Sequence, residues 1–482
     1  MVVLVAGLMG ACSSAASSSS GNDGSTPTTP LATVTAVETS IDDVLEPTTP
    51  IASTRCADHV DDPAAPVRVV AWEILGGEEA PRVFDAHVAE FRAAHPGVEL
   101  VVESINGGNE LLDTLQATPA EAWPDVLLAS PQALRRLVDT ERIVSPLECA
   151  AGARLEDGLM PVLRTLYRLD GVLQGVPYGV STPVLFFDRA EVRAAGLDPD
   201  DPPATLAELA AMSRQVVTSG ASPHGLVLTQ WYAHYLLLSG AVQRGELVVT
   251  PDNGRGAGPV GAQFDTRGAR ESLEWMLDVI ATGGGLWIGP VPSGYEDLIR
   301  IGDPVDGGAM AVHTSAAIGD VLAVIEAGSF PGVELGIGPM PGPGRGATVG
   351  GNGWFLVDHG DPRRVGAAFE LVEWLSAPSR LAMLAAATGY VPPSLSVTAE
   401  PVLVAAWAEH PQLRVAFDQI FSQPPTAAAA GPLFGPSREV DQLLFEFTSA
   451  VVEQGDDVVD ALASLDAQVA ALLAQYDAVI GG

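Results

Sequence analysis

The feature that most constrains the fold is an alternation of short apolar runs with helical stripes, which begins at about Pro66. Residues 67–72 form a strand-like run, and Phe84, Val88 and Phe91 then recur at helical spacing. The alternation continues with expected strands over 98–103 and 125–129, a helix over 111–116, and later helices over 365–375 and 462–476. Strand–helix–strand units of this length indicate parallel sheets covered by helices, so we expect an α/β fold.

Length and charge limit the classes of function. The chain has 482 residues, enough for two to four domains, and its formal net charge is −36. Every one of its 24 basic residues is Arg, so the Lys of a P-loop and a Schiff-base Lys are both excluded. No basic stretch offers phosphate neutralisation, so nucleic acid is not an expected partner. No continuous apolar window of 18 residues or more occurs, and we expect no transmembrane helix.

The N-terminal region indicates export and lipidation. Residues 1–11 are apolar and uncharged, as in the hydrophobic region of a signal peptide, although no Lys or Arg precedes them. Residues 8–12, Leu-Met-Gly-Ala-Cys, resemble a bacterial lipobox, which implies lipidation of Cys12. Residues 12–55 are rich in Ser, Thr, Pro, Gly and Ala, so we expect a low-complexity tether. This pattern places the folded body outside the cell, attached to the membrane through the lipid anchor only.

The cysteine count is consistent with an oxidising compartment. Cys56 and Cys149 remain as an even pair once Cys12 is set aside for lipidation, and a disulfide between them is the simplest inference. Two buried free thiols are the alternative. Neither Cys has a second Cys or a His at ligand spacing, so we expect no metal site and no cofactor.

Several separate motifs carry a resemblance to a known family. They are GVPYGVSTPVLFFD at 175–188, GAMAVHTS at 308–315, GGNGWFL at 350–356 and ATGYVPP at 387–393. In this order they resemble the extracellular solute-binding proteins of bacterial ABC importers, of the sugar-binding type, and the resemblance extends from about Pro66 to the C-terminus. It implies a two-lobed periplasmic-binding-protein-like fold, with a hinge crossed several times and a ligand cleft between the lobes.

The resemblance also implies boundaries and partners. Lobe 1 is expected over 66–183 and 308–350, and lobe 2 over 184–307 and 351–482. The expected partners are a small solute (a sugar, glycerol phosphate or glycerophosphodiester) and ABC permease subunits. The protein is expected to be a monomer.

The closest subgroup binds glycerol-3-phosphate and related glycerophosphodiesters, and its pocket residues are carried over by motif. They fall on Ser181, Trp231, Thr314 or Ser315, Gly351, Tyr390 and Arg438. Arg438 would hold phosphate as a bidentate fork, and Trp231 would stack on a sugar face or a choline cation. For each residue a structural role is the alternative: a core aromatic, a buried Tyr, a tight glycine turn or a surface Arg.

Two positions depart from the subgroup. Its glycerol-contacting Tyr falls near Asn109, and its pocket Glu falls near Ser130 or Pro131. Glu73, at the end of the first expected strand, is a further candidate for accepting hydroxyl bonds. The end of the site that would hold the polyol therefore differs from that of the subgroup. A ligand with a larger head group, or a plain sugar, is the alternative to glycerol-3-phosphate.

Other classes of function have weaker support. Hydrolase motifs such as Gly-x-Ser-x-Gly and His-Glu-x-x-His do not occur, and six of the eight histidines, His234 among them, are expected on helix or loop surfaces. We therefore do not expect an enzyme. A secreted glycan-active enzyme and a tethered adhesion or scaffold module remain the alternatives to a transport protein.

Overall fold

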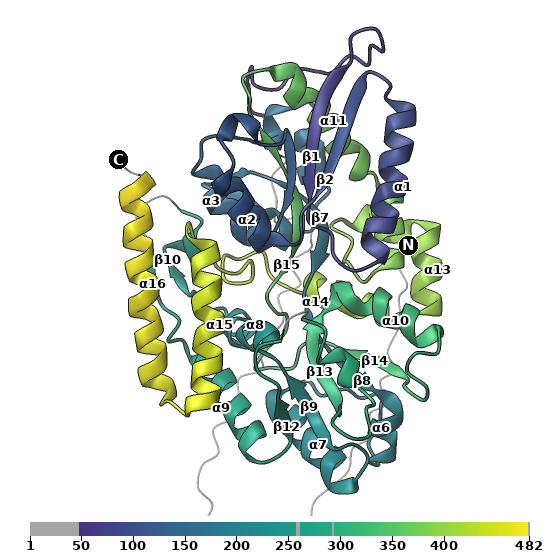
Figure 1. The fold of residues 1–482 in the computed structure, drawn as a ribbon, viewed down its shortest axis with the longest axis vertical. Helices are drawn as coiled ribbons and strands as arrows, with labels where there is room; N and C mark the ends of the chain where they lie inside the picture. The colour runs from purple at the N-terminus through teal and green to yellow at the C-terminus, as the bar shows by residue number, and fades with distance from the viewer. Residues whose placement is uncertain (1–47, 257–260, 292–293, 481–482) are drawn as a thin grey trace, which may run out of the picture. The chain divides into compact units, whose positions relative to one another are not determined.

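Two mixed β-sheets, each covered by helices, organise the folded chain (Figure 1). The computed structural model describes residues 48–256, 261–291 and 294–480. The first sheet has the order β2-β1-β3-β15-β4, with β7 also paired to β15; its strands are β1 (Val67–Glu73), β2 (Val98–Ser104), β3 (Val126–Ala129), β4 (Ile143–Val144), β7 (Val176–Ser181) and β15 (Gly350–Val357). The second has the order β12-β9-β13-β8-β14; its strands are β8 (Pro183–Asp188), β9 (His224–Leu228), β12 (Gly285–Trp287), β13 (Gly308–Thr314) and β14 (Leu335–Gly338). We call the bodies built on these sheets lobe 1 and lobe 2.

Helices cover both sheets, and the expected elements are present. Lobe 1 carries α1 (Glu79–Ala94), α2 (Gly108–Ala117), α3 (Leu134–Val138), α4 (Gly152–Asp157), α5 (Pro161–Leu166), α11 (Pro362–Leu375), α12 (Pro378–Ala387) and α13 (Pro401–Glu409). Lobe 2 carries α6 (Arg189–Ala194), α7 (Leu206–Ser219), α8 (Gln230–Arg244), α9 (Arg267–Ala281), α10 (Ile318–Glu326), α14 (Val415–Phe421), α15 (Ser437–Gln454) and α16 (Val458–Ile480). The stripe of Phe84, Val88 and Phe91 on α1 is buried, as its spacing predicts. The α/β class is thus confirmed.

The expectation of parallel sheets is confirmed for some strand pairs and wrong for others. The strand pairs β1–β2, β1–β3, β9–β12 and β9–β13 are parallel, as the strand–helix alternation predicts. However, β15 is antiparallel to β3, β4 and β7, and β8 is antiparallel to β13 and β14. The strands β8 and β15 enter their sheets from the other lobe rather than through a local helix, so no helical crossover imposes a parallel direction on them.

The expected division of the later chain between the lobes is also wrong. Residues 308–338 belong to lobe 2, because Met310 pairs with Phe187 and Ala311 pairs with both Phe186 and Val227. Conversely, β15 pairs with β3 in lobe 1, and α11 and α12 pack on the lobe 1 side. The expected boundaries come from the family resemblance, and the apolar pattern of a strand does not itself specify which sheet the strand joins. The end of the chain, with α15 and α16, lies in lobe 2 as expected. The assignments of 66–181 to lobe 1 and of β8, β9 and β12 to lobe 2 agree with the sheets.

The helix α16 is long and apolar enough to cross a membrane by length and composition alone, which the search for uninterrupted apolar windows did not predict. Alanine raises its mean hydropathy between scattered Asp residues. Its stripe of Leu462, Leu465, Val469 and Leu473 is buried in the core of lobe 2. The buried stripe covers 28% of the apolar window, so α16 packs on lobe 2 through one narrow face.

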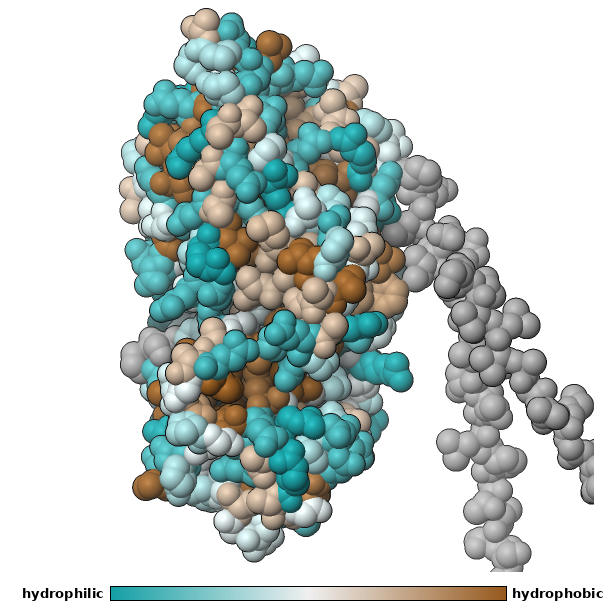
Figure 2. All heavy atoms as spheres, turned by 90° about the vertical axis from the view of Figure 1, so that its right-hand side faces the viewer, coloured by the Kyte–Doolittle hydropathy of each residue, from teal (hydrophilic) through white to brown (hydrophobic). Residues whose placement is uncertain are grey.

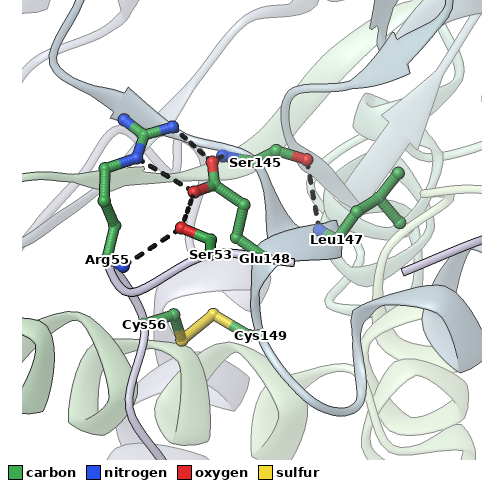
Figure 3. The surroundings of a disulfide bond; sticks show 7 residues. All are labelled: Ser53, Arg55, Cys56, Ser145, Leu147, Glu148 and Cys149. Carbon is green, nitrogen blue, oxygen red and sulfur yellow. Dashed lines mark hydrogen bonds and ion pairs between the residues drawn. A yellow bond between two sulfur atoms is a disulfide. The ribbon is translucent and has the colours of Figure 1, made fainter. Parts of the chain in front are cut away.

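The end of the expected tether is attached to lobe 1. Residues 1–47, which include the expected signal peptide and Cys12, lie outside the described residues. Within the expected tether of 12–55, however, the amide of Ile51 donates to the carbonyl of Leu147 (2.9 Å), and the Arg55 guanidinium pairs with the carboxylate of Glu148. The structure also contains the expected Cys56–Cys149 disulfide beside this pair (Figure 3). Of the expected tether, residues 48–55 therefore belong to the folded body.

Breaking this disulfide should destabilise the folded chain. The bond spans 93 residues, and the chain-entropy relation gives about 4–5 kcal/mol for such a loop as an upper figure. We expect Cys149→Ala to lower the free energy of unfolding by about 2–4 kcal/mol in denaturant titrations. The double variant Cys56→Ala/Cys149→Ala is the control, because either change alone removes the bond. Equal stability of wild type and both variants would contradict the prediction.

Candidate functional site

A cleft lies at the junction of the two lobes. One cavity, of about 180 Å³, is lined from lobe 1 by Asn109 and Ser130 and from lobe 2 by Trp231 and Asp441, among others. A second, of about 220 Å³, lies at the hinge and is lined by Ser181, Thr182, Pro183, Trp231, Tyr235, Thr314, Thr348, Gly350 and Gly351. Both cavities share Trp231, Tyr235 and Thr348, so they form one continuous cleft.

A third cavity is separate from this cleft. It measures about 190 Å³ and lies on the surface of lobe 2, with lining residues from α10 and the segment around Leu298. Apolar side chains gather in hollows on the face that carries α10 (Figure 2). None of its described lining residues is shared with the cleft, and its lining comes from one lobe only. The cleft between the lobes, with aromatic and polar groups from both sides, is the candidate ligand site.

The hinge depends on one residue, Thr182, which alone separates β7 from β8. Its amide donates to the hydroxyl of Ser315 (3.3 Å), and its carbonyl accepts from the amide of Ser315 (2.9 Å). Its hydroxyl donates to the carbonyl of Thr348 (2.9 Å) and accepts from the side-chain amide of Gln419 (2.8 Å). Each polar group of this buried residue is therefore satisfied within the hinge.

Gln419 joins two crossings of the chain between the lobes. Its amide group also donates to the carbonyl of Pro183 (2.9 Å), and its side-chain oxygen accepts from the amide of Met340 (2.7 Å). Pro183 begins β8, and Met340 lies on the segment that leads from β14 back to β15. One buried side chain on α14 thus fixes the outward and the returning segments against each other.

Five of the predicted site residues line the cleft: Asn109, Ser181, Trp231, Thr314 and Gly351. The indole N–H of Trp231 donates to the carbonyl of Val291 (2.8 Å), which fixes the ring while 37% of the residue stays exposed. At Gly351 the backbone has φ +93°, and an added Cβ would lie 1.9 Å from the carbonyl oxygen of Gly179. The close approach of β15 to β7 therefore requires glycine there, whatever its contact with a ligand.

Four predicted residues are not among the described lining residues of the cleft. Glu73 is buried and accepts from the amide of Leu75 (2.6 Å). Ser315 is fully buried and serves the hinge.

The other two are Tyr390 and Arg438. The hydroxyl of Tyr390 accepts from the side-chain amide of Asn352 (3.5 Å), and burial raises the pKa of Tyr390 to about 12. Arg438, the expected phosphate contact, extends its Nε toward a carboxylate oxygen of Asp113 on α2, 3.6 Å away.

The structure adds residues that the motifs did not reveal. Asp441 and Phe445 follow Arg438 on α15 at helical spacing and line the cleft, and Tyr235 lies one turn after Trp231 on α8. Burial raises the pKa of Asp441 to about 7, and the charge of Arg438 opposes this rise. The spacing i, i+3, i+7 from Arg438 was the signal that could have found them.

His234 is buried and lines the cleft, so its expected surface position is wrong. Burial lowers its pKa to about 4, and its ring is neutral at pH 7. Its ring lies 4.6 Å from that of Phe445, edge to face, so an apolar helix contact with α15 holds it in place.

Polar contacts join the lobes at both edges of the cleft. Asp320 on α10 accepts from the amides of Glu78 and Glu79 at the start of α1, both at 3.3 Å. At the opposite edge Arg136 on α3 pairs with Glu439 on α15 (3.0 Å). Across the described ranges no group of three or more His, Cys, Asp or Glu side chains could hold a metal ion.

Comparison with known proteins identifies the family. Residues 86–414 match the family described as bacterial extracellular solute-binding protein, which is more than half of the chain. The chain belongs to this family.

Relatives of this solute-binding protein include the sn-glycerol-3-phosphate-binding periplasmic protein UgpB of Rhizobium meliloti (strain 1021). The two are 26% identical over 298 residues, which is 61% of this chain and 66% of the relative, just under two thirds of its length. Among solved structures, UgpB of Mycobacterium tuberculosis in complex with glycerophosphocholine has a TM-score of 0.67 and 16% identity, covering 85% of this chain and 99% of that one. The sugar-binding protein MalE of Xanthomonas citri has a TM-score of 0.67 and 22% identity, covering 86% and 99%. These structures confirm the two-lobed fold.

Removal of the Thr182 hydroxyl should weaken the hinge. Thr182→Val keeps the side-chain shape but leaves the carbonyl of Thr348 and the amide of Gln419 each without this partner. We expect the free energy of unfolding to fall by about 1–3 kcal/mol, measured by denaturant titration. Thr218→Val, on the exposed side of α7, is the matched control. A loss no larger than that of the control would contradict the prediction.

Proposed function

We propose that this protein is the solute-binding component of an ABC importer. It captures a sugar or a glycerol-phosphate-type solute in the cleft and delivers it to permease subunits in the membrane. The observation that supports this most directly is the cleft itself, where Trp231 and Tyr235 meet hydroxyl and backbone groups of the hinge. An aromatic face and several hydroxyls suit the C–H and O–H groups of a polyhydroxylated ligand.

Within that class the cleft favours a solute without a phosphate monoester. No Arg is among the described residues that line either cavity, and the one carboxylate among them is Asp441. The second candidate, a phosphorylated glycerol, is favoured by the name of the Rhizobium meliloti relative. It would require Arg438 to leave Asp113 and enter the cleft.

The protein is not proposed as an enzyme or a scaffold. Family members bind solutes, and the cleft lining contains one carboxylate where a glycosidase needs a pair. Formation of product from a bound sugar would favour an enzyme, and absence of any solute-dependent change in shape would favour a scaffold.

We also propose that lipidated Cys12 holds the protein on the extracytoplasmic face of the membrane, as a monomer. The support is the apolar segment 1–11, the lipobox-like junction and the Ser-rich segment behind it. Since the chain is attached to lobe 1 from Thr48 onward, the tether would be the segment between Cys12 and that point.

Replacement of Cys12 should release the protein from membranes. We expect Cys12→Ala to appear in the medium or to remain unprocessed, because it lacks the thiol that takes the lipid. Cell fractionation with immunoblotting measures this, with Cys56→Ala as the control that retains the lipidation site. Membrane retention of Cys12→Ala equal to that of the wild type would contradict the proposal.

Truncation of Trp231 should weaken the binding of neutral sugars. We expect Trp231→Ala to reduce the affinity of whichever of maltose and trehalose binds by about tenfold, because stacking on the ring is lost. Isothermal titration calorimetry with maltose, trehalose, glycerol-3-phosphate and glycerophosphocholine measures the affinities.

Trp287→Ala is the matched control, since Trp287 is also half-buried in lobe 2 with its indole N–H bonded, to Glu453. A similar loss in both variants would mean that Trp231 acts through stability rather than contact. If none of the four solutes binds the wild type, the transport assignment fails.

A further inference from the structure

The described side chains that line the cleft include an acidic group but no Arg. Among the described residues that line the two cavities, Asp441 is the one Asp or Glu, and none is Arg. His234 adds no positive charge at pH 7, because burial lowers its pKa to about 4. Once Asp441 is ionised, a solute in this cleft meets a negative group, and none of the described lining residues carries a fixed positive charge.

Asp441 lacks the partners that usually accompany a half-buried carboxylate. In the part of the chain that the structure describes, it makes no hydrogen bond and no ion pair within 4.0 Å. Arg438, one turn earlier on α15, is directed at Asp113 of lobe 1 instead. Burying an unpaired carboxylate is unfavourable, so a cation supplied by the ligand would be stabilised beside it.

Aromatic rings surround the same end of the cleft. The rings of Trp231 and Phe445 lie 5.3 Å apart with an interplanar angle of 69°, and Tyr235 lines the cavity beside them. The electron-rich faces of such rings attract ammonium groups, and the attraction grows when water is excluded. The rings and the carboxylate thus favour the same ligand chemistry.

We propose that the cleft binds a positively charged nitrogen of its solute, with Asp441 as the counter-ion and Trp231, Tyr235 and Phe445 around it. This rests on the proposed function and names the part of the solute that the site selects. The ligand class is a polyhydroxylated or glycerol-type solute bearing a protonated amine or a quaternary ammonium group. A formal net charge of −36 on the chain would also attract such a solute and repel an anion at long range.

The test compares probes that differ in one charge. Choline and its uncharged carbon isostere 3,3-dimethylbutan-1-ol have nearly the same shape, and glucosamine with glucose forms the corresponding amine pair. Titration calorimetry is run at about pH 8, so that Asp441 is ionised. We expect choline, glucosamine or both to bind at least about tenfold more tightly than the uncharged partner.

Two variants test whether the preference for the charged probe depends on Asp441. Asp441→Asn should remove the preference for the charged probe over its uncharged partner, because the amide carries no charge. Glu446→Gln removes the same charge from an exposed position on the same helix and should leave the preference unchanged. Thermal unfolding of Asp441→Asn should match or exceed that of the wild type, because a desolvated carboxylate is lost.

The outcomes separate this inference from the proposed function. If neither charged probe binds more tightly than its uncharged partner, or if Asp441→Asn keeps the preference, the inference is overturned. Should maltose or trehalose then still bind, the proposed function stands without it. If no solute of any kind binds the folded wild type, the proposed function fails as well.

Discussion

The connection between the two lobes depends on the hydrogen bonds of Thr182. This residue joins a strand of lobe 1 directly to a strand of lobe 2. Because no loop lies between the strands, a change in the backbone conformation of Thr182 would change the orientation of one lobe relative to the other. Its three polar groups make four hydrogen bonds to Ser315, Thr348 and Gln419, which come from three further segments of the chain. The hinge is thus built as a buried polar network, and the cleft lies directly against it because Thr182 and Thr348 also line the cavity.

This arrangement separates the rigid part of the cleft from the part that can change. The hinge contacts are buried, whereas the pair of Arg136 with Glu439 at one edge is partly exposed to water. Exposed ion pairs contribute little to stability, so opening at that edge loses less free energy than any rearrangement at Thr182. At the other edge Asp320 accepts from two amides at the start of α1, both at 3.3 Å, while burial and the charges of Glu79 and Glu78 raise its pKa. Lobe movement is therefore expected to be a rotation about the hinge rather than a rearrangement within it.

Sequence patterns were sufficient to predict the helices and strands, but they were insufficient to predict which sheet each strand joins. The stripes on α1, α11 and α16 and the apolar runs of β1 to β3 follow from local periodicity. The membership of β13 and β15 could not follow from it, because a buried strand has the same pattern in either sheet. The site shows the same limit. Trp231 and Ser181 were found by motif, but whether Arg438 faces the cleft or Asp113 depends on side-chain direction across two lobes, which no linear pattern contains.

The two-lobed fold is shared with UgpB in complex with glycerophosphocholine and with the sugar-binding protein MalE, at identities of 16% and 22%. Backbone similarity at that level indicates a cleft between the lobes but does not indicate which side chains line it. The residues that distinguish one solute from another are few. In this chain α8 and α15 pack together, and Trp231, Tyr235, Asp441 and Phe445 on these helices line the first cavity. If the side chain of Arg438 turned from Asp113 toward the cleft, its positive charge would offset the negative charge of Asp441 there. The choice between an anionic and a cationic solute therefore depends on whether Asp113 or the cleft holds that guanidinium group, and in this structure it is directed at Asp113.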